Sequence, residues 1–149
     1  MKLPILFAAA VALLPLYAQA AADPRQYIPA PPMPGAGVTP PFSAAVMAGA
    51  TLYVSGTTDG GPARGGTSAD AAKRVLDNIK RTVEAAGLTM DDLVWVQVFS
   101  SDLADYAAFN EVYRSYFKGP LPARAYLGVD LLLGGAKFEV MGIAVKRGT

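Results

Sequence analysis

The segment from Leu93 to Ser100 reads LVWVQVFS, and it decides the fold class. Its residues are mostly β-branched or aromatic, which favours a β-strand. The apolar run is too continuous for a strand with one face in water, so we expect a central strand with both faces covered. Alternation along the strand places Trp95 and Phe99 on one face and the valines on the other. Trp95 is expected to lie in the core.

A helix is predicted before this strand, over residues 68–86. Ser68 can cap its N-terminus, and Gly87 is placed to end it. The apolar residues between them recur at the spacing of one helix face, namely Ala72, Val75, Leu76, Ile79, Val83 and Ala86. We therefore expect an amphipathic helix that packs on the sheet.

A second helix is predicted after the strand, capped by Ser101 or Asp102 and ended by Gly119 and Pro120. Asn110 is the polar residue on its otherwise apolar face. Its amide either ties down a loop or lines a cavity. The tyrosines of this helix are expected to pack in the core and to take no part in catalysis. The face consists of Leu103, Tyr106, Asn110, Tyr113 and Phe117.

The remaining strands complete one sheet. Two short apolar runs over 42–48 and 51–55 flank a turn at Gly49 and predict a β-hairpin. The final two strands are predicted over 123–129 and 136–145, with Gly134 and Gly135 in the turn between them. The order is β-β-α-β-α-β-β, an α+β domain with one mixed sheet and both helices on one face. The other face needs cover, which we expect from another copy of the chain.

The first 22 residues, MKLPILFAAAVALLPLYAQAAA, have the pattern of a secretory signal. Lys2 precedes an apolar run, and small residues over 18–22 form an A-x-A type cleavage site. The alternative is a membrane anchor, but the run is short for a bilayer and is broken by Pro4 and Pro15. We expect cleavage near residues 20–22, export to the periplasm and no stable membrane anchor afterwards.

Two segments are expected to lack helices and central strands. Residues 23–41 contain seven prolines, so we expect an extended tether leading into a domain over 42–147. Residues 56–67, GTTDGGPARGGT, invite a phosphate-binding interpretation. A P-loop requires a Lys after its last glycine, however, and the chain has Gly66-Thr67-Ser68 there. A mobile surface loop is expected instead.

Composition excludes several classes of function. The 149 residues are 52% hydrophobic, which suits one domain. Without Lys2 the basic and acidic residues balance, so no nucleic-acid partner is expected. The chain has no Cys and no His, which removes nucleophilic triads, imidazole catalysis and the usual zinc ligands. We expect neither a metal nor a cofactor.

Two residues on the final strands are candidates for chemistry. Arg124 opens the 123–129 strand, where its planar fork can bind a carboxylate, although a structural salt bridge would fit equally well. Glu139 shares a strand face with Met141 and Ile143, and a carboxylate among apolar neighbours needs a cation, a donor or a proton. It is a candidate base, or it pairs with a nearby cation. We expect Arg124 and Glu139 to face one crevice.

Six short segments give the chain a family resemblance from about Pro40 to Arg147. Their order and spacing are similar to those of the Rid family, the YjgF-like reactive-intermediate deaminases, and the Pro-Ala-Arg triplet is the most specific of them. The segments are Pro41-Phe42-Ser43, Val54-Ser55-Gly56, LDNIK over 76–80, FNEVY over 109–113, Pro122-Ala123-Arg124 and Phe138-Glu139-Val140.

The resemblance implies a chorismate-mutase-like domain that forms homotrimers, with sites in the clefts between subunits. It implies that Arg124 binds a substrate carboxylate and that Glu139 holds the attacking water. The reaction would be hydrolysis of 2-imino or enamine acids, such as 2-aminoacrylate, 2-iminopropanoate and 2-iminobutanoate, to 2-oxo acids and ammonia without a cofactor. The expected pocket residues are Phe42, Ser55, Gly56, Asn110 and Ala125.

Two departures from the family pattern leave the size of the substrate open. Thr57 stands where glutamine often follows Ser-Gly, and Phe42 replaces a frequent tyrosine. Three other functions remain as alternatives: a trimeric small-ligand-binding or chaperone-like module, an endoribonuclease, and a chorismate-rearranging enzyme. The neutral mature chain offers little to a phosphate backbone, and a dicarboxylate such as chorismate would require several cations.

Overall fold

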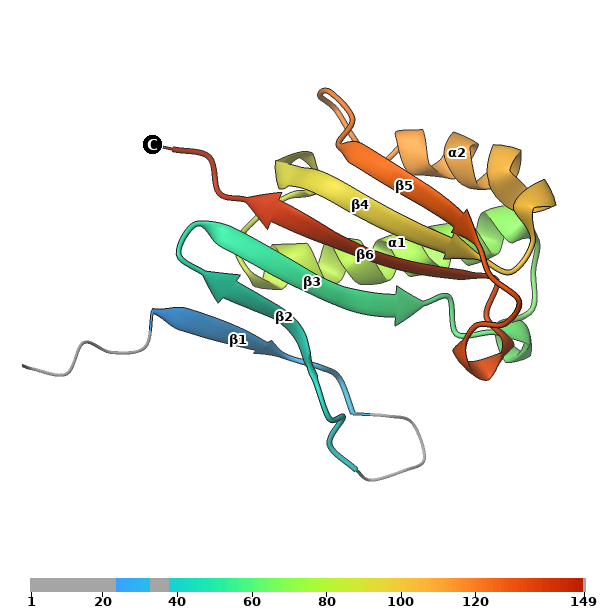
Figure 1. Ribbon diagram of the computed structural model, residues 1–149, viewed down its shortest axis with the longest axis horizontal. Coiled ribbons are helices and arrows are strands. Elements are labelled where there is room, and N and C mark those ends of the chain that lie inside the picture. Colours follow the sequence, from blue (N-terminus) through green and yellow to red (C-terminus); the bar gives the residue numbers. More distant parts are fainter. Residues whose placement is uncertain (1–23, 33–37, 149) are drawn as a thin grey trace, which may run out of the picture.

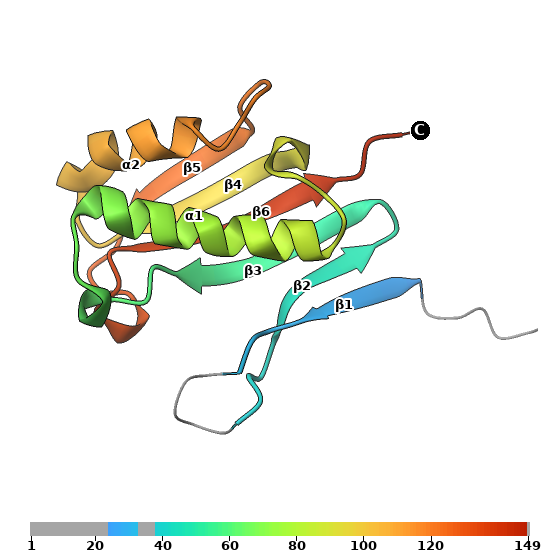
Figure 2. The ribbon, with the colours of Figure 1, turned by 180° about the vertical axis from the view of Figure 1, so that it is seen from behind.

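The computed structural model describes residues 24–32 and 38–148. They form a six-stranded sheet in the order β1-β2-β3-β6-β4-β5, with α1 and α2 on one face (Figures 1 and 2). Only β4 and β5 pair in parallel, so the sheet is mixed, as predicted. The bounds are β1 Arg25–Pro29, β2 Ser43–Ala48, β3 Thr51–Thr58, α1 Ser68–Ala85, β4 Leu93–Ser100, α2 Tyr106–Arg114, β5 Ala123–Gly128 and β6 Phe138–Val145. The expected signal lies outside the described residues.

The expected tether contains a strand that the sequence interpretation missed. β1 pairs antiparallel with β2, with Tyr27 opposite Val46. It is an edge strand, and its only proline is its last residue, so the prolines that exclude a central strand do not exclude this one. The element order therefore has three strands, not two, before α1.

The final two strands are not neighbours, as Figure 1 shows. β6 lies between β3 and β4, whereas β5 pairs only with β4 at the far edge. A chain segment of nine residues joins β5 to β6, and it contains the 3-10 turn Leu133–Gly135. β4 is therefore interior to the sheet, as predicted, and it separates the strands that carry Arg124 and Glu139.

The cap of the first helix differs by one residue from the prediction, whereas Asp102, one of the two predicted caps, does cap the second. Thr67, not Ser68, caps α1: its hydroxyl accepts from the Asp70 N–H, and the Asp70 carboxylate accepts from the Thr67 N–H. This reciprocal pair is a capping box. The second helix begins as a 3-10 turn over Leu103–Asp105, which Asp102 caps, and α2 itself is shorter than predicted.

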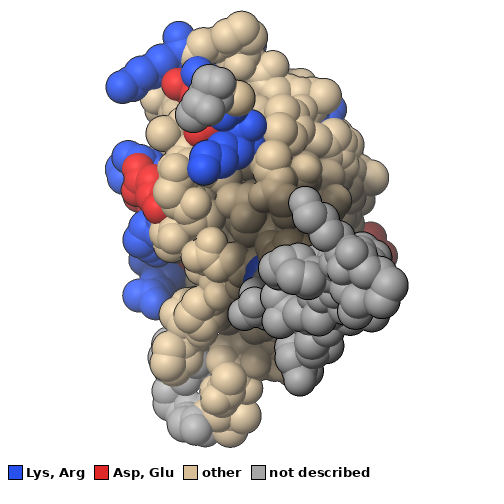
Figure 3. Space-filling model, turned by 90° about the vertical axis from the view of Figure 1, so that its left-hand side faces the viewer, with Lys and Arg blue, Asp and Glu red and all other residues tan. Residues whose placement is uncertain are grey.

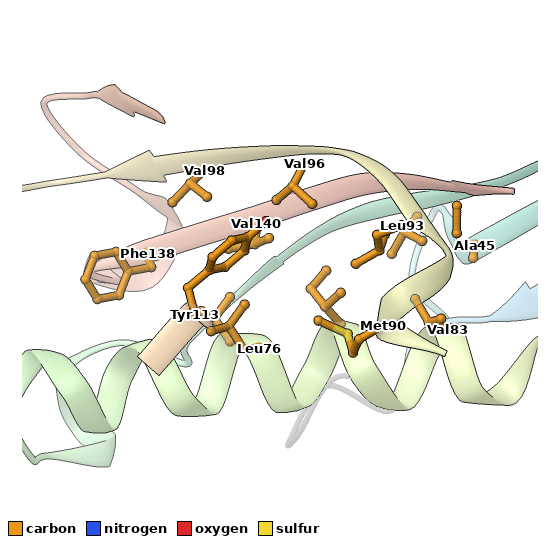
Figure 4. Packing of buried hydrophobic residues seen from close by; sticks show 14 of the residues in the cluster. Ala45, Leu76, Val83, Met90, Leu93, Val96, Val98, Tyr113, Phe138 and Val140 are labelled. Atoms are coloured by element: carbon orange, nitrogen blue, oxygen red, sulfur yellow. The ribbon is translucent and has the colours of Figure 1, made fainter. Parts of the chain in front are cut away.

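The core lies between the sheet and α1 (Figure 4). Val96 and Val98 of β4 and Phe138 and Val140 of β6 are buried against the helices. The predicted apolar face of α1 covers them, and this burial is the main contribution to stability. In the predicted loop over 56–67, residues 56–58 belong to β3, and residues 62–67 are exposed, as expected of a surface loop. The buried carboxylate of Asp59 anchors the loop because it accepts from the N–H groups of Gly61 and Lys137.

The opposite face of the sheet is uncovered in a single chain. Trp95, Gln97 and Phe99 of β4 are only part-buried there, and so are Met141 and Ile143 of β6. Trp95 is therefore outside the core of one chain, contrary to expectation, because nothing in the described chain packs over that face.

Among the described residues, no helix is long and apolar enough to cross a membrane.

Candidate functional site

Glu139 lies on the uncovered face, where β6 pairs it with Phe99 of β4 and Thr58 of β3. Its carboxylate extends over Gly56, so closely that a Cβ built at Gly56 would overlap Oε1. The β3–β6 register shifts between Val54 and Thr57, and this bulge brings Gly56 under the carboxylate. No hydrogen bond or ion pair joins the Glu139 carboxylate to another described residue. Its oxygens are therefore available to a ligand or a water molecule.

The Glu139 carboxylate opens into a pocket of about 550 Å³, here called the Glu139 pocket. The pocket lies where β2 and β3 part at their ends, and α1 closes its other side. Ser55 is tied to this wall because its hydroxyl donates to the Ser43 carbonyl at 2.8 Å. The lining is mostly apolar and consists of Ile28, Pro29, Ala30, Pro31, Pro40, Phe42, Ala44, Ser55, Gly56, Thr57, Thr58, Asn78, Arg81, Thr82, Ala85, Leu133 and Glu139.

Arg124 lies on the other face of the sheet. In the parallel β4–β5 pair Arg124 is registered with Val96 and Tyr126 with Val98, both of which face the helices. The Arg124 guanidinium donates from Nη2 to Oδ1 of Asn110 on α2 at 2.7 Å. Asn110 therefore orients the guanidinium, a contact that differs from both roles expected for its amide, tying down a loop or lining a cavity.

Four aromatic rings surround the Arg124 guanidinium. Its Cζ is 4.7 Å from the centroid of the Tyr113 ring and 5.5 Å from that of Tyr126. Tyr106 and Phe109 lie at 5.8 and 5.9 Å. Cation–π contacts of this kind hold the planar group and leave its N–H edges for a ligand.

Tyr106 and Tyr113 were expected only to pack, and sequence reasoning missed their contact, and that of Tyr126, with Arg124. The signal that could have found it is their position: Tyr106 and Tyr113 flank Asn110 on one helix face, and Tyr126 follows Arg124 by two residues on one strand face. Burial raises the pKa of Tyr113 to about 12, although the charge of Arg124 opposes the shift. The Tyr113 phenol therefore stays neutral at physiological pH and is no base.

The structure does not bring all the expected site residues together. The Glu139 pocket contains Phe42, Ser55 and Gly56. Asn110 instead contacts Arg124 on the helix side of the sheet. Ala125 belongs to neither group, since its register with Gln97 puts it on the uncovered face. Within one chain Arg124 and Glu139 do not face one crevice, because they point to opposite faces of the sheet with β4 between their strands. A crevice formed between two copies stays a prediction.

Comparison with known proteins identifies the family. The profile described as "Endoribonuclease L-PSP" matches residues 36–146. A Mus musculus protein named 2-iminobutanoate/2-iminopropanoate deaminase is 36% identical over 110 residues, which cover 71% of this chain and 82% of that protein. The Homo sapiens protein of the same name is 34% identical, covering 74% of this chain and 83% of its own.

Solved structures agree with the sequence comparison. The YjgF gene product of E. coli is 36% identical with a TM-score of 0.66, covering 72% of this chain and 89% of that one. E. coli TdcF, solved with bound serine, is 33% identical with a TM-score of 0.68, covering 74% and 91%. Because the profile spans most of the chain and these relatives cover 71–74% of it, the chain belongs to the endoribonuclease L-PSP family, that of the YjgF-like proteins.

Proposed function

We propose that this protein hydrolyses small 2-imino acids to 2-oxo acids and ammonia. The observation that carries the proposal is the Glu139 carboxylate, which enters a pocket over Gly56 and has no partner among the described residues. The names of the mouse and human relatives support the reaction. The structure of TdcF with bound serine supports a ligand that carries a carboxylate and a nitrogen on the same carbon.

The site is proposed to form between two copies of the chain, because one copy holds its two halves on opposite faces. The guanidinium of Arg124 from one copy would meet the Glu139 pocket of its neighbour. The uncovered face of the sheet, with Trp95, Phe99 and Ile143 part-exposed, supports assembly, since apolar surface of that kind is normally buried in soluble proteins. We propose a homotrimer in which each cleft is one site.

In this site Arg124 grips the substrate carboxylate through two N–H groups, with its plane held by the aromatic cage and by Asn110. The imine carbon then lies beside a water molecule that the Glu139 carboxylate binds. Glu139 accepts a proton as the water oxygen bonds to that carbon. With the iminium form of the substrate, this step gives a neutral adduct that carries one hydroxyl and one amino group. The amino group takes the proton from Glu139 and leaves as ammonia, while the hydroxyl proton passes to the Glu139 carboxylate and the 2-oxo acid remains. Glu139 then gives this last proton to solvent. Positioning is sufficient because such imines also hydrolyse unaided.

The proposal includes export to the periplasm, which rests on the signal pattern of residues 1–22. Expression of the full chain in a Gram-negative host, followed by N-terminal sequencing of the periplasmic fraction, tests it. A mature start near residues 21–23 is expected. A protein that stays in the cytoplasm with its first residues intact would contradict export while leaving the reaction untouched.

The reaction is tested by generating 2-iminopropanoate enzymatically in the presence of purified protein and following the loss of the imine. The wild type is expected to exceed the blank, and Arg124→Ala and Glu139→Gln are expected to fall to it. If the wild type also matches the blank, the deaminase proposal fails. Retained binding of serine by calorimetry in that case would favour the ligand-binding module.

The family description names an endoribonuclease, but the surface gives that activity little support. The full chain has 13 basic and 12 acidic residues. On the face shown in Figure 3, most of the visible Lys and Arg atoms lie in the upper part and toward the left border, with acidic residues among them. RNA binding depends on a basic surface, so we do not propose it for this chain.

A further inference from the structure

The Glu139 pocket is larger than the smallest imino acids require. Its volume is about 550 Å³. A three-carbon imine fills on the order of 100 Å³ at the packing density of organic matter. Besides Glu139 and the end of β3, the lining includes Asn78, Arg81 and Thr82 of α1. A substrate whose reactive carbon lies at Glu139 can therefore extend a side chain toward α1.

Arg81 is the only cation among the described residues that line this pocket, and Glu139 is the only anion. The described ion pairs are formed by Lys73, Lys80, Lys137 and Arg147, so Arg81 belongs to none of them. The nearby carboxylate of Asp77 hydrogen-bonds to Lys73 and Tyr116, and Arg81 acts on it only through its charge, which helps to lower the pKa of Asp77. Arg81 thus keeps charge and N–H groups available at the far end of the pocket.

Asn78 holds Arg81 in that position. The Asn78 amide donates from Nδ2 to the Thr58 carbonyl at 2.9 Å and to the Thr57 hydroxyl at 3.3 Å. Its Oδ1 accepts from Nη2 of Arg81. Hydrogen bonds to β3 fix the Asn78 amide, and the amide accepts from one guanidinium nitrogen. This contact restricts the orientation of the guanidinium, and with it the direction of the other N–H groups of Arg81.

We propose that Arg81 binds a second anionic group at the end of the substrate side chain, so that the site selects 2-imino acids derived from acidic amino acids. The α-carboxylate would lie on Arg124 of the neighbouring copy and the distal carboxylate on Arg81, with the imine carbon between them at Glu139. This inference rests on the proposed function for the chemistry of the imine. The selection of a distal anion rests on the pocket alone, and the two can be tested apart.

The first test measures binding of the stable 2-oxo acid products to the full chain by calorimetry. The two probes are 2-oxoglutarate and 2-oxopentanoate, which have the same chain length and differ in the distal carboxylate. The wild type is expected to bind 2-oxoglutarate about tenfold more tightly, as a charge-assisted contact allows. Arg81→Gln is expected to lose this preference, and Arg81→Lys is expected to keep part of it.

Lys80→Gln is the matched control, because it removes the same charge from the adjacent residue, which pairs with Glu84 and does not line the Glu139 pocket. It is expected to bind both probes like the wild type. The inference is overturned if the wild type binds neither probe, binds both equally, or keeps its preference in Arg81→Gln.

The second test repeats the comparison with the imines of the two probes, generated in place, and measures kcat/KM. A preference for 2-iminoglutarate that only Arg81→Gln abolishes supports the inference and the proposed function together. If 2-oxoglutarate binds selectively but neither imine is lost faster than in the blank, the proposed function fails and the role of Arg81 stands. If both imines are hydrolysed without preference, the role of Arg81 fails and the proposed function stands.

Discussion

Gly56 is required by the approach of the Glu139 carboxylate and not by a turn. A methyl group at this position would overlap Oε1, so Gly56→Ala must displace the carboxylate from its place over the β3 backbone. The displaced group is the end of a flexible side chain, so the fold is expected to survive. We expect kcat/KM for 2-iminopropanoate to fall about tenfold or more, since catalysis depends on placing the water.

Gly119→Ala is the control for this substitution. The space around Gly119 is open apart from one Asp91 oxygen, which lies 4.0 Å from the point that the added methyl carbon would occupy, so the activity of this variant should equal that of the wild type. The melting temperatures of both variants separate a displaced carboxylate from an unfolded chain. Full activity in Gly56→Ala would show that the position of the carboxylate over Gly56 does not matter to the reaction.

The neutral amide of Asn110 orients the Arg124 guanidinium without neutralising its charge. A carboxylate at this position would do both, so the two cases can be told apart by measurement. Asn110→Asp would place a carboxylate at hydrogen-bond distance from Nη2, where the amide oxygen is now 2.7 Å away. The new ion pair would compete with the substrate carboxylate for the guanidinium. We expect KM to rise about tenfold with a smaller change in kcat. A KM equal to that of the wild type would mean that substrate does not bind at Arg124.

Tyr113 is predicted to make the protein sensitive to alkali. Its hydroxyl is buried without a hydrogen-bond partner, and burial raises its pKa from 10.0 to about 12. The folded state holds the proton more tightly than the unfolded state, so stability is complete below pH 10 and falls as pH rises toward 12.

Tyr113→Phe removes both the proton and the unsatisfied hydroxyl. We expect the variant to be as stable as the wild type or more stable by about 0.5–1 kcal/mol at neutral pH. Urea unfolding at several pH values between about 8 and 11.5 checks the dependence. Equal alkaline loss of stability in both proteins would assign the effect to other groups, such as Tyr116 and Tyr126, whose pKa values burial also raises.

Sequence reasoning at the residue scale singled out Arg124 and Glu139 because each is a charge on a largely apolar strand, and the family resemblance gave them roles that stay predictions. It could not find the aromatic cage, because Tyr106 and Tyr113 have the same helical spacing whether they pack on a core or on a guanidinium. It also placed Arg124 and Glu139 in one crevice, which requires knowing which strands are neighbours and which face each residue takes. Pairing between distant segments decides that, and local pattern does not contain it.

At the element scale, the cap of α1 is expected to contribute about 1 kcal/mol to stability. Thr67→Ala removes the hydroxyl that accepts from the Asp70 N–H. Urea unfolding is expected to show this loss with an unchanged m-value. Thr39→Ala is the control, because Thr39 is exposed and its side chain has no hydrogen bond among the described residues. Equal stability of Thr67→Ala and the control would contradict a capping role.

The strands show which elements local sequence determines. The bounds of β4 were predicted correctly because a run of β-branched and aromatic residues begins and ends with the strand. β1 was missed because the segment around Arg25–Pro29 is rich in proline. An edge strand tolerates proline where the missing N–H would face solvent and not the neighbouring strand. The capping residue was misplaced by one position because Thr67 and Ser68 are both good caps, and only the reciprocal bond to Asp70 distinguishes them.

At the scale of the whole molecule, the question is whether Arg124 and Glu139 reach one site from two copies of the chain that meet at the uncovered face of the sheet. Arg124 and Asn110 lie on the helix side of an edge strand, whereas Glu139 lies on the open side beside a different part of the sheet. No rotation of a side chain carries either group through the sheet. If both act on one substrate, two copies must supply them, and a chain that lacks one group can then be rescued by a chain that lacks the other.

Mixing two inactive variants tests this directly. Arg124→Ala and Glu139→Gln should each be inactive alone, but when they are unfolded together and reassembled in equal amounts, about a quarter of the sites should combine an intact Arg124 with an intact Glu139 from different copies. We expect the mixture to regain about that fraction of wild-type imine hydrolysis. The double variant reassembled with wild type controls for refolding. If the mixture stays inactive while this control recovers activity, both groups act from the same copy or not at all, and a site between subunits is excluded.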